Sequence, residues 1–291
     1  MKRKSFWLIL LFLIPFVIMI SFFIVEKPDT ETKVSNFKER LDDQIEEQTE
    51  EEKEENYSQT PSYKERLQYI IDHAQHIFAN KAAQIVAIGD SLTEGVGDET
   101  KQGGYVGMLE QTLQEKKVLA RIENLGKSGN RTNQLRERLN EVDIAQSIKR
   151  ADMIFITIGA NDIMYVLKKN ITNITIEPFI KEKERYETRL KDIFTRLREL
   201  NQDAEVYLIG FYNPFEAYFH DIEELTELTR QWNEVGQEVT ANDSRAYFIP
   251  TADLFVGRTS ELLSDDYFHP NQAGYEVIAN RIIQFLNQME R

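Results

Sequence analysis

Residues 85–95 read IVAIGDSLTEG, a short apolar run that ends in glycine and passes directly into a polar turn. Such a run is typical of a buried strand that leads into a helix. Four further runs share the pattern, namely IENLG (122–126), MIFITIG (153–159), VYLIGF (206–211) and AYFIP (246–250). Five buried strands are therefore predicted.

Helical patterns separate these strands. They cover residues 105–116, 133–149 (one helix or two), 178–200, 222–241 and 272–289, and a further one at 63–79 precedes the first strand. Alternating strands and helices imply a parallel sheet that is covered on both faces. We predict an α/β fold, a three-layer α/β/α sandwich with a five-stranded parallel sheet, whose ligands bind at the carboxyl ends of the strands.

The N-terminal 25 residues predict a cytoplasmic tip and a transmembrane anchor. Three basic residues precede Ser5–Val25, an uncharged run long enough to cross a hydrocarbon core of roughly 30 Å. The run ends in SFFIVEKP, which lacks an A-x-A cleavage site, so an anchor is favoured over a cleaved signal peptide. Because basic residues stay cytoplasmic, we expect a single-pass bacterial membrane protein with its domain outside the cytoplasm, or a secreted protein if the segment is cleaved.

The rest of the chain divides into a stalk and a domain. Residues 26–62 are strongly acidic and poor in apolar residues, which predicts a disordered or partly helical stalk. Residues 63–291 form the predicted folded domain. The net charge of the chain is -14, which argues against a nucleic-acid partner, and the absence of cysteine excludes disulfides and a cysteine nucleophile.

Polar residues follow the first three strands. Gly89-Asp90-Ser91 stands at the first turn, where a serine is exposed and its own N–H can point into a site; a simple helix N-cap is the alternative. Gly129, after the second strand, can present a backbone N–H to an anion or belong to an ordinary turn. Asn161-Asp162, after the third strand, offers an amide donor or a helix cap.

Near the C-terminus, Asp266 precedes His269 by three residues. An acid at this spacing can accept the Nδ1–H bond of the histidine and leave Nε2 free as a base toward a serine. Asp265 is the alternative acid, with less suitable spacing. His220 is the alternative base, but no acid stands three residues before it.

These four blocks, in this order, resemble the GDSL-type hydrolases of the SGNH family, whose name lists a serine, a glycine, an asparagine and a histidine. The resemblance covers roughly residue 84 to the C-terminus. It implies a flavodoxin-like fold and acyl transfer through a nucleophilic Ser91 with His269 as base and Asp266 as orienting acid. It also implies an oxyanion hole formed by the N–H groups of Ser91 and Gly129 and the side chain of Asn161. Gly89, Asp90 and Asp162 support these residues. The serine lacks the G-x-S-x-G context of the common α/β-hydrolases.

The function predicted first is therefore a serine esterase or lipase-like acylhydrolase that needs neither cofactor nor metal. Its substrate is expected to be a small-molecule, lipid or acylated-glycan ester. An O-acetylesterase of cell-wall or surface glycans and a non-catalytic surface binding module are the alternatives. Residues 164–177 and 211–215 are candidate substrate walls or plain surface loops. His73 and His76, three residues apart, lack further metal ligands nearby.

Overall fold

The structure is a computed structural model that describes residues 82–115, 117–170, 175–213, 215–216 and 223–288. The predicted anchor, stalk and first helix lie outside these residues, as do His73, His76 and His220. Within the described part of the chain, no helix is long and apolar enough to span a membrane.

Five parallel strands form one sheet in the order β2-β1-β3-β4-β5. The strands are β1 (Ala83–Gly89), β2 (Ala120–Gly126), β3 (Met153–Thr157), β4 (Glu205–Ile209) and β5 (Ala246–Ile249). In register, Gly89 lies opposite Gly126 on one side and Thr157 on the other. The carboxyl ends of the central strands are therefore level, and the five predicted strands are confirmed.

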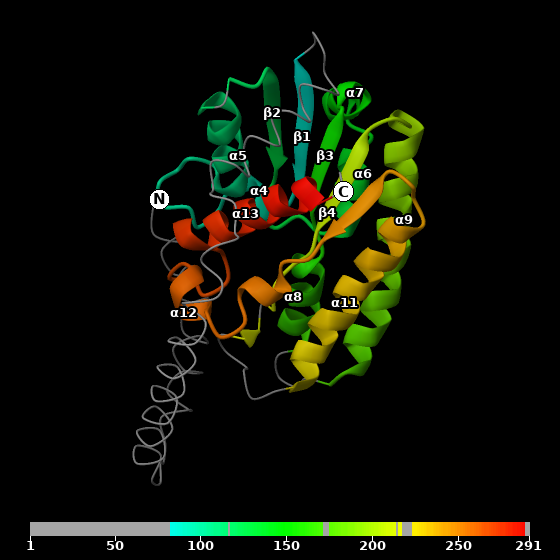
Figure 1. Ribbon diagram of the computed structural model, residues 1–291. Coiled ribbons are helices and arrows are strands. Elements are labelled where there is room, and N and C mark those ends of the chain that lie inside the picture. Colours follow the sequence, from blue (N-terminus) through cyan, green and yellow to red (C-terminus); the bar gives the residue numbers. More distant parts are fainter. Residues whose placement is uncertain (1–81, 116, 171–174, 214, 217–222, 289–291) are drawn as a thin grey trace, which may run out of the picture. The chain divides into compact units, whose positions relative to one another are not determined.

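Helices cover both faces of this sheet (Figure 1). One face carries α5 (Gly104–Glu115) and α13 (Gln272–Gln288). The other carries α6 (Thr132–Arg138), α7 (Val142–Arg150), α9 (Glu177–Leu200) and α11 (Glu223–Ala241). The predicted three-layer sandwich is confirmed, and the helical pattern at 133–149 is two helices.

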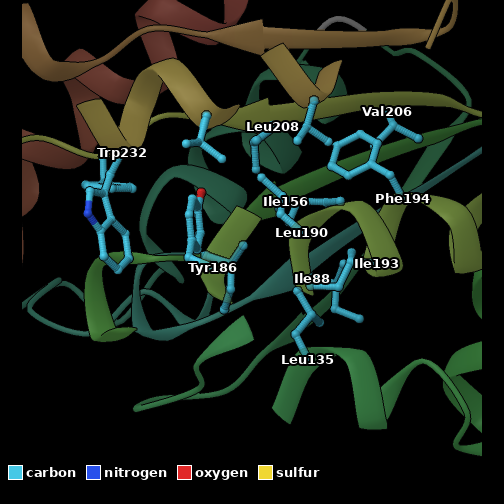
Figure 2. Packing of buried hydrophobic residues seen from close by; sticks show 14 of the residues in the cluster. Ile88, Leu135, Ile156, Tyr186, Leu190, Ile193, Phe194, Val206, Leu208 and Trp232 are labelled. Carbon is cyan, nitrogen blue, oxygen red and sulfur yellow. The ribbon is translucent and has the colours of Figure 1, made fainter. Parts of the chain in front are cut away.

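The strands are apolar because both of their faces are buried. Along β1, Val86 and Ile88 pack into the cluster under α9 and α11, whereas Ile85 and Ala87 pack into the cluster under α5 and α13. Figure 2 shows Ile88 beside side chains of α9, and Trp232 of α11 near Tyr186. The rings of Tyr186 and Trp232 stack at 4.8 Å. Burial of each large apolar side chain here contributes roughly 1.5–3 kcal/mol to the free energy of folding, so the sheet holds the residues at its edge in place.

Four short or peripheral elements follow strand ends: α4 (Ser91–Glu94), α8 (Ala160–Lys169), the 3-10 helix η1 (Ala252–Leu254) and α12 (Thr259–Leu262). Residues 164–169, part of a candidate wall or loop in the sequence, belong to α8. This helix packs mainly on α9 and lies beyond the carboxyl ends of the strands (Figure 1). It therefore flanks the edge where ligands bind in sheets of this type.

Candidate active site

The turn after β1 holds Ser91 at the first position of α4. Asp90 is the N-cap of this helix, and its Oδ1 accepts a hydrogen bond of 3.1 Å from the N–H of Leu92. The preceding Gly89 has no room for a side chain, because a Cβ there would lie 2.1 Å from the carbonyl oxygen of Thr157. The cap is thus Asp90, and the hydroxyl of Ser91 is left for another partner.

That partner is His269. Its Nε2 lies 2.9 Å from Oγ of Ser91, and its Nδ1 lies 2.6 Å from Oδ2 of Asp266. Asp266, and not Asp265, is therefore the carboxylate that contacts the imidazole. The structure brings together the serine, histidine and aspartate that the sequence selected.

Asp266 is held by the loop to which it belongs. Its Oδ1 accepts hydrogen bonds of 2.9 Å from the backbone N–H groups of Phe268 and His269 and from the hydroxyl of Ser264. Partial burial acts to raise the pKa of Asp266, but the hydrogen bonds from His269, Phe268 and Ser264 outweigh it and lower the pKa to about 2. Asp266 is therefore a carboxylate near neutral pH, the form that orients an imidazole through Nδ1–H.

Two residues tie the histidine loop to other segments: Gly97, which the sequence did not select, and Tyr212, which belongs to the candidate wall at 211–215. A Cβ on Gly97 would lie 2.5 Å from the carbonyl oxygen of Pro270 and 2.9 Å from Cβ of His269, so a glycine allows this approach. The hydroxyl of Tyr212 donates a 2.5 Å hydrogen bond to the carbonyl of Phe268. Neither contact has a local pattern, because each joins segments far apart in the sequence.

Gly129 and Asn161 lie on two segments that a hydrogen bond to the neighbouring Asn130 joins. Gly129 has a φ of +75° in the turn from Lys127 to Asn130, where the N–H of Asn130 donates to the carbonyl of Lys127 at 3.1 Å. The side-chain amide of Asn161, in the first turn of α8, donates to the carbonyl of Asn130 at 3.1 Å. The N–H of Lys127 donates to the carbonyl of Gly89 at 3.0 Å, which ties this loop to the turn of Ser91.

Arg138 of α6, another residue that was not selected from the sequence, holds the same loop through hydrogen bonds. Its guanidinium donates to Oδ1 of Asn130 at 3.0 Å and to the carbonyl oxygens of Gly89 and Leu125 at 3.3 and 2.7 Å. Although it is a charged residue, Arg138 is only 9% exposed. Its place three residues after the buried Leu135 on α6 is the only local signal, since i and i+3 share a helix face.

Asp162 is a structural neighbour of the site rather than one of the residues that line it. Its carboxylate accepts hydrogen bonds from the N–H and hydroxyl of Thr132 at 3.0 and 2.8 Å, and Arg189 donates to it at 3.0 Å. Burial raises the pKa of Asp162, while the hydrogen bonds from Thr132 and the charge of Arg189 oppose that rise. These contacts join the start of α6 to α8.

Behind the serine, a chain of hydroxyl groups leads to Asp90. Thr157 donates to Oδ1 of Asp90 at 2.9 Å, Thr93 lies 2.6 Å from Thr157, and the hydroxyl of Tyr105 lies 2.9 Å from Thr93. Burial raises the pKa of Asp90 to about 7, although the hydrogen bonds from Thr157 and Leu92 act in the opposite direction. Thr157 ends the apolar strand MIFIT, so a polar residue at the end of an apolar run was the available signal.

A small pocket of about 30 Å³ opens beside these groups. Ser91, Asn161 and His269 line it together with apolar side chains that include Ile158, Ile209, Phe211 and Tyr212. The candidate wall at 211–215 thus contributes its first two residues. Among the described residues, no group of three or more histidine, aspartate and glutamate side chains is placed to hold a metal ion.

The fold, with this site at the carboxyl edge of its sheet, is that of an ester-hydrolysing serine hydrolase. The model of the GDSL-like lipase/acylhydrolase family matches residues 87–277, and the chain belongs to this family. The predicted class of enzyme is therefore confirmed, as is the predicted SGNH hydrolase fold.

Two proteins of known sequence are similar to this chain. The uncharacterized protein YpmR of Bacillus subtilis is 36% identical over 208 residues, which cover 70% of this chain and 81% of that protein. The spore germination lipase LipC of Bacillus licheniformis is 29% identical over 212 residues, which cover 68% of this chain and 94% of that protein. Both similarities are long enough to include most of the folded domain.

Two solved structures share the fold. The lipase Lip_vut3 from a goat rumen metagenome superimposes with a TM-score of 0.62 at 27% identity and covers 69% of this chain and 95% of its own. A catalytic mutant of Axe2, an acetylxylan esterase from Geobacillus stearothermophilus, gives a TM-score of 0.53 at 25% identity, with 69% and 92% covered. Both are similar to residues of the α/β/α domain.

Proposed function

We propose that this family member hydrolyses carboxylic esters through Ser91, His269 and Asp266. The observation that carries the proposal is the continuous hydrogen-bonded line from Oγ of Ser91 to Nε2 of His269, 2.9 Å, and from Nδ1 of His269 to Asp266, 2.6 Å. A nucleophile and a base within hydrogen-bond reach, with a third group that orients the base, are the requirements for nucleophilic catalysis.

In the proposed reaction, Nε2 of His269 takes the proton of Ser91 as Oγ attacks the ester carbonyl carbon. The oxyanion is held by the N–H groups of Ser91 and Gly129 and by the amide of Asn161. When the tetrahedral intermediate collapses, the protonated His269 gives its proton to the departing alcohol and an acyl-serine remains. Water then attacks the acyl group, His269 takes its proton, and the acid is released as Ser91 regains a proton.

Replacement of Ser91 tests this proposal. Ser91→Ala should lower kcat on short p-nitrophenyl esters by about 10⁶-fold, since loss of the nucleophile leaves only binding and oxyanion stabilisation. A fluorophosphonate probe should label the wild-type enzyme and not this variant. Ser128→Ala, on the exposed loop nearby, is the matched control and should keep full activity and labelling. Unchanged hydrolysis by Ser91→Ala would refute the assignment.

We also propose that the enzyme is held by residues 1–25 in a bacterial cell membrane, with 26–62 as a stalk and the domain outside the cytoplasm. The support is the apolar run Ser5–Val25 behind three basic residues. The full-length chain should sediment with membranes, and a chain without residues 1–25 should not. Protease added outside intact protoplasts should degrade the domain; protection of the domain there would contradict the orientation.

An O-acetylesterase of cell-wall or surface glycans is the second candidate, and the size of the pocket favours it. A volume of about 30 Å³ suits an acyl group about as small as acetyl, because one water molecule alone requires roughly 10–15 Å³ on the same scale. The similarity to an acetylxylan esterase supports the same substrate class. Esters of two to eight acyl carbons should show kcat/KM falling with length, and isolated acetylated cell wall should release acetate. A rate that rises with chain length would favour a lipase instead.

A further inference from the structure

The exposed face of α8 carries an aromatic ring between two cations. The guanidinium carbon of Arg131 lies 4.0 Å from the centre of the Tyr165 ring, and Nζ of Lys169 lies 4.6 Å from the same centre. Both distances are within the range of cation–π attraction. The phenol of Tyr165 is exposed, so this cluster faces solvent rather than the core. We call Arg131, Tyr165 and Lys169 the α8 cluster.

The α8 cluster adjoins the proposed oxyanion hole. Tyr165 follows Asn161 by four residues on α8, which puts the two on the same helix face with Cβ atoms about 5–6 Å apart. Arg131 directly follows Asn130, whose carbonyl accepts the hydrogen bond from the side chain of Asn161. Tyr165 and Lys169 thus lie one and two turns along α8 from Asn161, which lines the pocket, and Arg131 reaches the same place from the loop that contacts Asn161.

No carboxylate of the described residues forms an ion pair with Arg131 or Lys169. Two buried acids interact electrostatically with the cluster, Asp162 with Arg131 and Glu182 with Tyr165, and both acids are bound to Arg189, at 3.0 and 2.7 Å. The pKa of Tyr165 is lowered, first by the hydrogen bond that Lys169 donates to its phenol oxygen and then by the charges of Lys169 and Arg131, as expected where the potential is positive. In a chain with a net charge of -14, this is a local excess of positive charge beside the site.

The acyl pocket is lined largely by apolar side chains, so an anionic group of the substrate has to stay outside it, on the alcohol portion of the ester. We propose that the α8 cluster is a subsite for a phosphate or carboxylate carried by that alcohol. The ring of Tyr165 holds both cations in place, and the cations attract the anion. This inference rests on the proposed function and specifies in addition that the substrate is an anionic ester.

Paired acetates, one with an anionic group on its alcohol portion and one without it, test the subsite. For the carboxylate, 4-acetoxybenzoate is compared with the neutral 4-acetoxybenzamide; for the phosphate, 1-acetylglycerol 3-phosphate is compared with 1-acetylglycerol. At low salt, the full-length enzyme should show kcat/KM about tenfold higher for the charged member of at least one pair, and the preference should shrink with added salt. The pair with the larger ratio identifies the source of the anion.

Variants locate the effect. Arg131→Gln and Lys169→Gln should each lower the charged-to-neutral ratio about two- to fivefold, with kcat/KM for the neutral acetate unchanged. Tyr165→Leu should lower the ratio as well, whereas Tyr165→Phe keeps the ring and should retain it. Lys149→Gln, an equal charge change at the exposed end of α7, should leave the ratio as it is. A wild-type ratio of one, or a ratio that neither charge variant changes, would overturn the subsite.

Binding separates this inference from the proposed reaction. In the Ser91→Ala chain, 4-acetoxybenzoate should bind more tightly than 4-acetoxybenzamide, and Arg131→Gln added to that chain should abolish the difference in Kd. This measurement needs no turnover. If the enzyme hydrolyses charged and neutral acetates equally well, the subsite is refuted and the proposed reaction is not. If the charged acetate binds with the lower Kd but the wild type hydrolyses neither, the reaction is refuted and the subsite is not.

Discussion

The turn that carries Ser91 and the loop that carries His269 meet at one hydrogen bond, yet they are built differently. Ser91 is 4% exposed, and its neighbour Asp90 lies in a buried chain of hydroxyl groups. The side chains of Asp266 and His269 are 49% and 18% exposed, and they are held by hydrogen bonds within residues 264–269. The core therefore positions the serine, whereas a local turn orients the histidine.

This difference separates stability from activity. A change in the turn of Ser91 disturbs polar groups that water cannot reach, so it is expected to reduce the free energy of unfolding. A change in the histidine loop leaves groups that water can solvate, so it is expected to act mainly on the reaction.

The largest effect is expected for His269→Ala. Loss of the proposed base should lower kcat by about 10⁴- to 10⁶-fold, while the free energy of unfolding changes by no more than about 1 kcal/mol. Ester hydrolysis and urea denaturation of the same preparation measure both quantities. Asp265→Ala, in the same loop, is the matched control. Its kcat should stay unchanged, because Asp266 and not Asp265 contacts the ring of His269. An equal loss of kcat in Asp265→Ala and Asp266→Ala would remove the proposed role of Asp266.

The second prediction uses pH, because the two carboxylates titrate on opposite sides of their ordinary value of 3.8. The folded-state pKa of Asp90 is raised to about 7, so its contribution to stability is present below about pH 4 and is lost as the pH rises through 7. The pKa of Asp266 is lowered to about 2, so its contribution is present above about pH 4 and is lost as the pH falls through 2.

Denaturation series from pH 2 to pH 8 should separate these two groups. Asp90→Asn should flatten the decline in stability between pH 4 and pH 7, a slope of up to about 1.4 kcal/mol per pH unit. Asp266→Asn should change the slope only below pH 4, and by less, because half of its side chain is exposed. Identical slopes in wild type and Asp90→Asn would show that the buried carboxyl is not linked to folding in this way.

The smallest effect is expected for Thr157→Val, which keeps the shape of the side chain but removes the donor to Asp90. The free energy of unfolding should fall by about 1–3 kcal/mol, with kcat reduced less than tenfold. The loss of a hydrogen bond that lowers the folded-state pKa of Asp90 should also extend the stability decline, which still begins near pH 4, to higher pH. Thr188→Val, on the exposed face of α9, should change stability by no more than about 0.5 kcal/mol. An equal loss of stability in both threonine variants would show that the buried hydrogen bond from Thr157 to Asp90 is not the cause.

Much of this could be predicted from residues adjacent in sequence. The alternation of apolar runs and helical patterns predicted all five strands, because both faces of a parallel sheet must be apolar. The pattern missed the full length of α8, since residues 164–169 lie on a peripheral helix with one exposed face. The three-residue spacing from Asp266 to His269 predicted their contact, because one turn of chain brings such residues together.

Other features depended on contacts between distant segments. The sequence left open whether the turn of Asp90 and Ser91 is a simple helix cap or part of a site. In the structure Asp90 is the cap, and the hydroxyl of Ser91 faces the imidazole of His269, 178 residues further on. The local patterns at Arg138 and Thr157 indicated at most that these side chains face inward. Their partners, Asn130 and Asp90, and the close approach of Gly97 to His269 depend on the fold.

The amino-acid sequence alone predicts the class of fold, the order of the strands along the chain and the residue types at the sheet edge. These follow from periodicity and from short-range spacing, which act within a few residues. The tertiary structure adds which hydroxyl meets the imidazole, how small the pocket beside Ser91 is, and that Arg131 and Lys169 lie on the ring of Tyr165. Those facts depend on packing between segments from different strands and helices, because distances between such segments are set by the whole fold and not by neighbours along the chain.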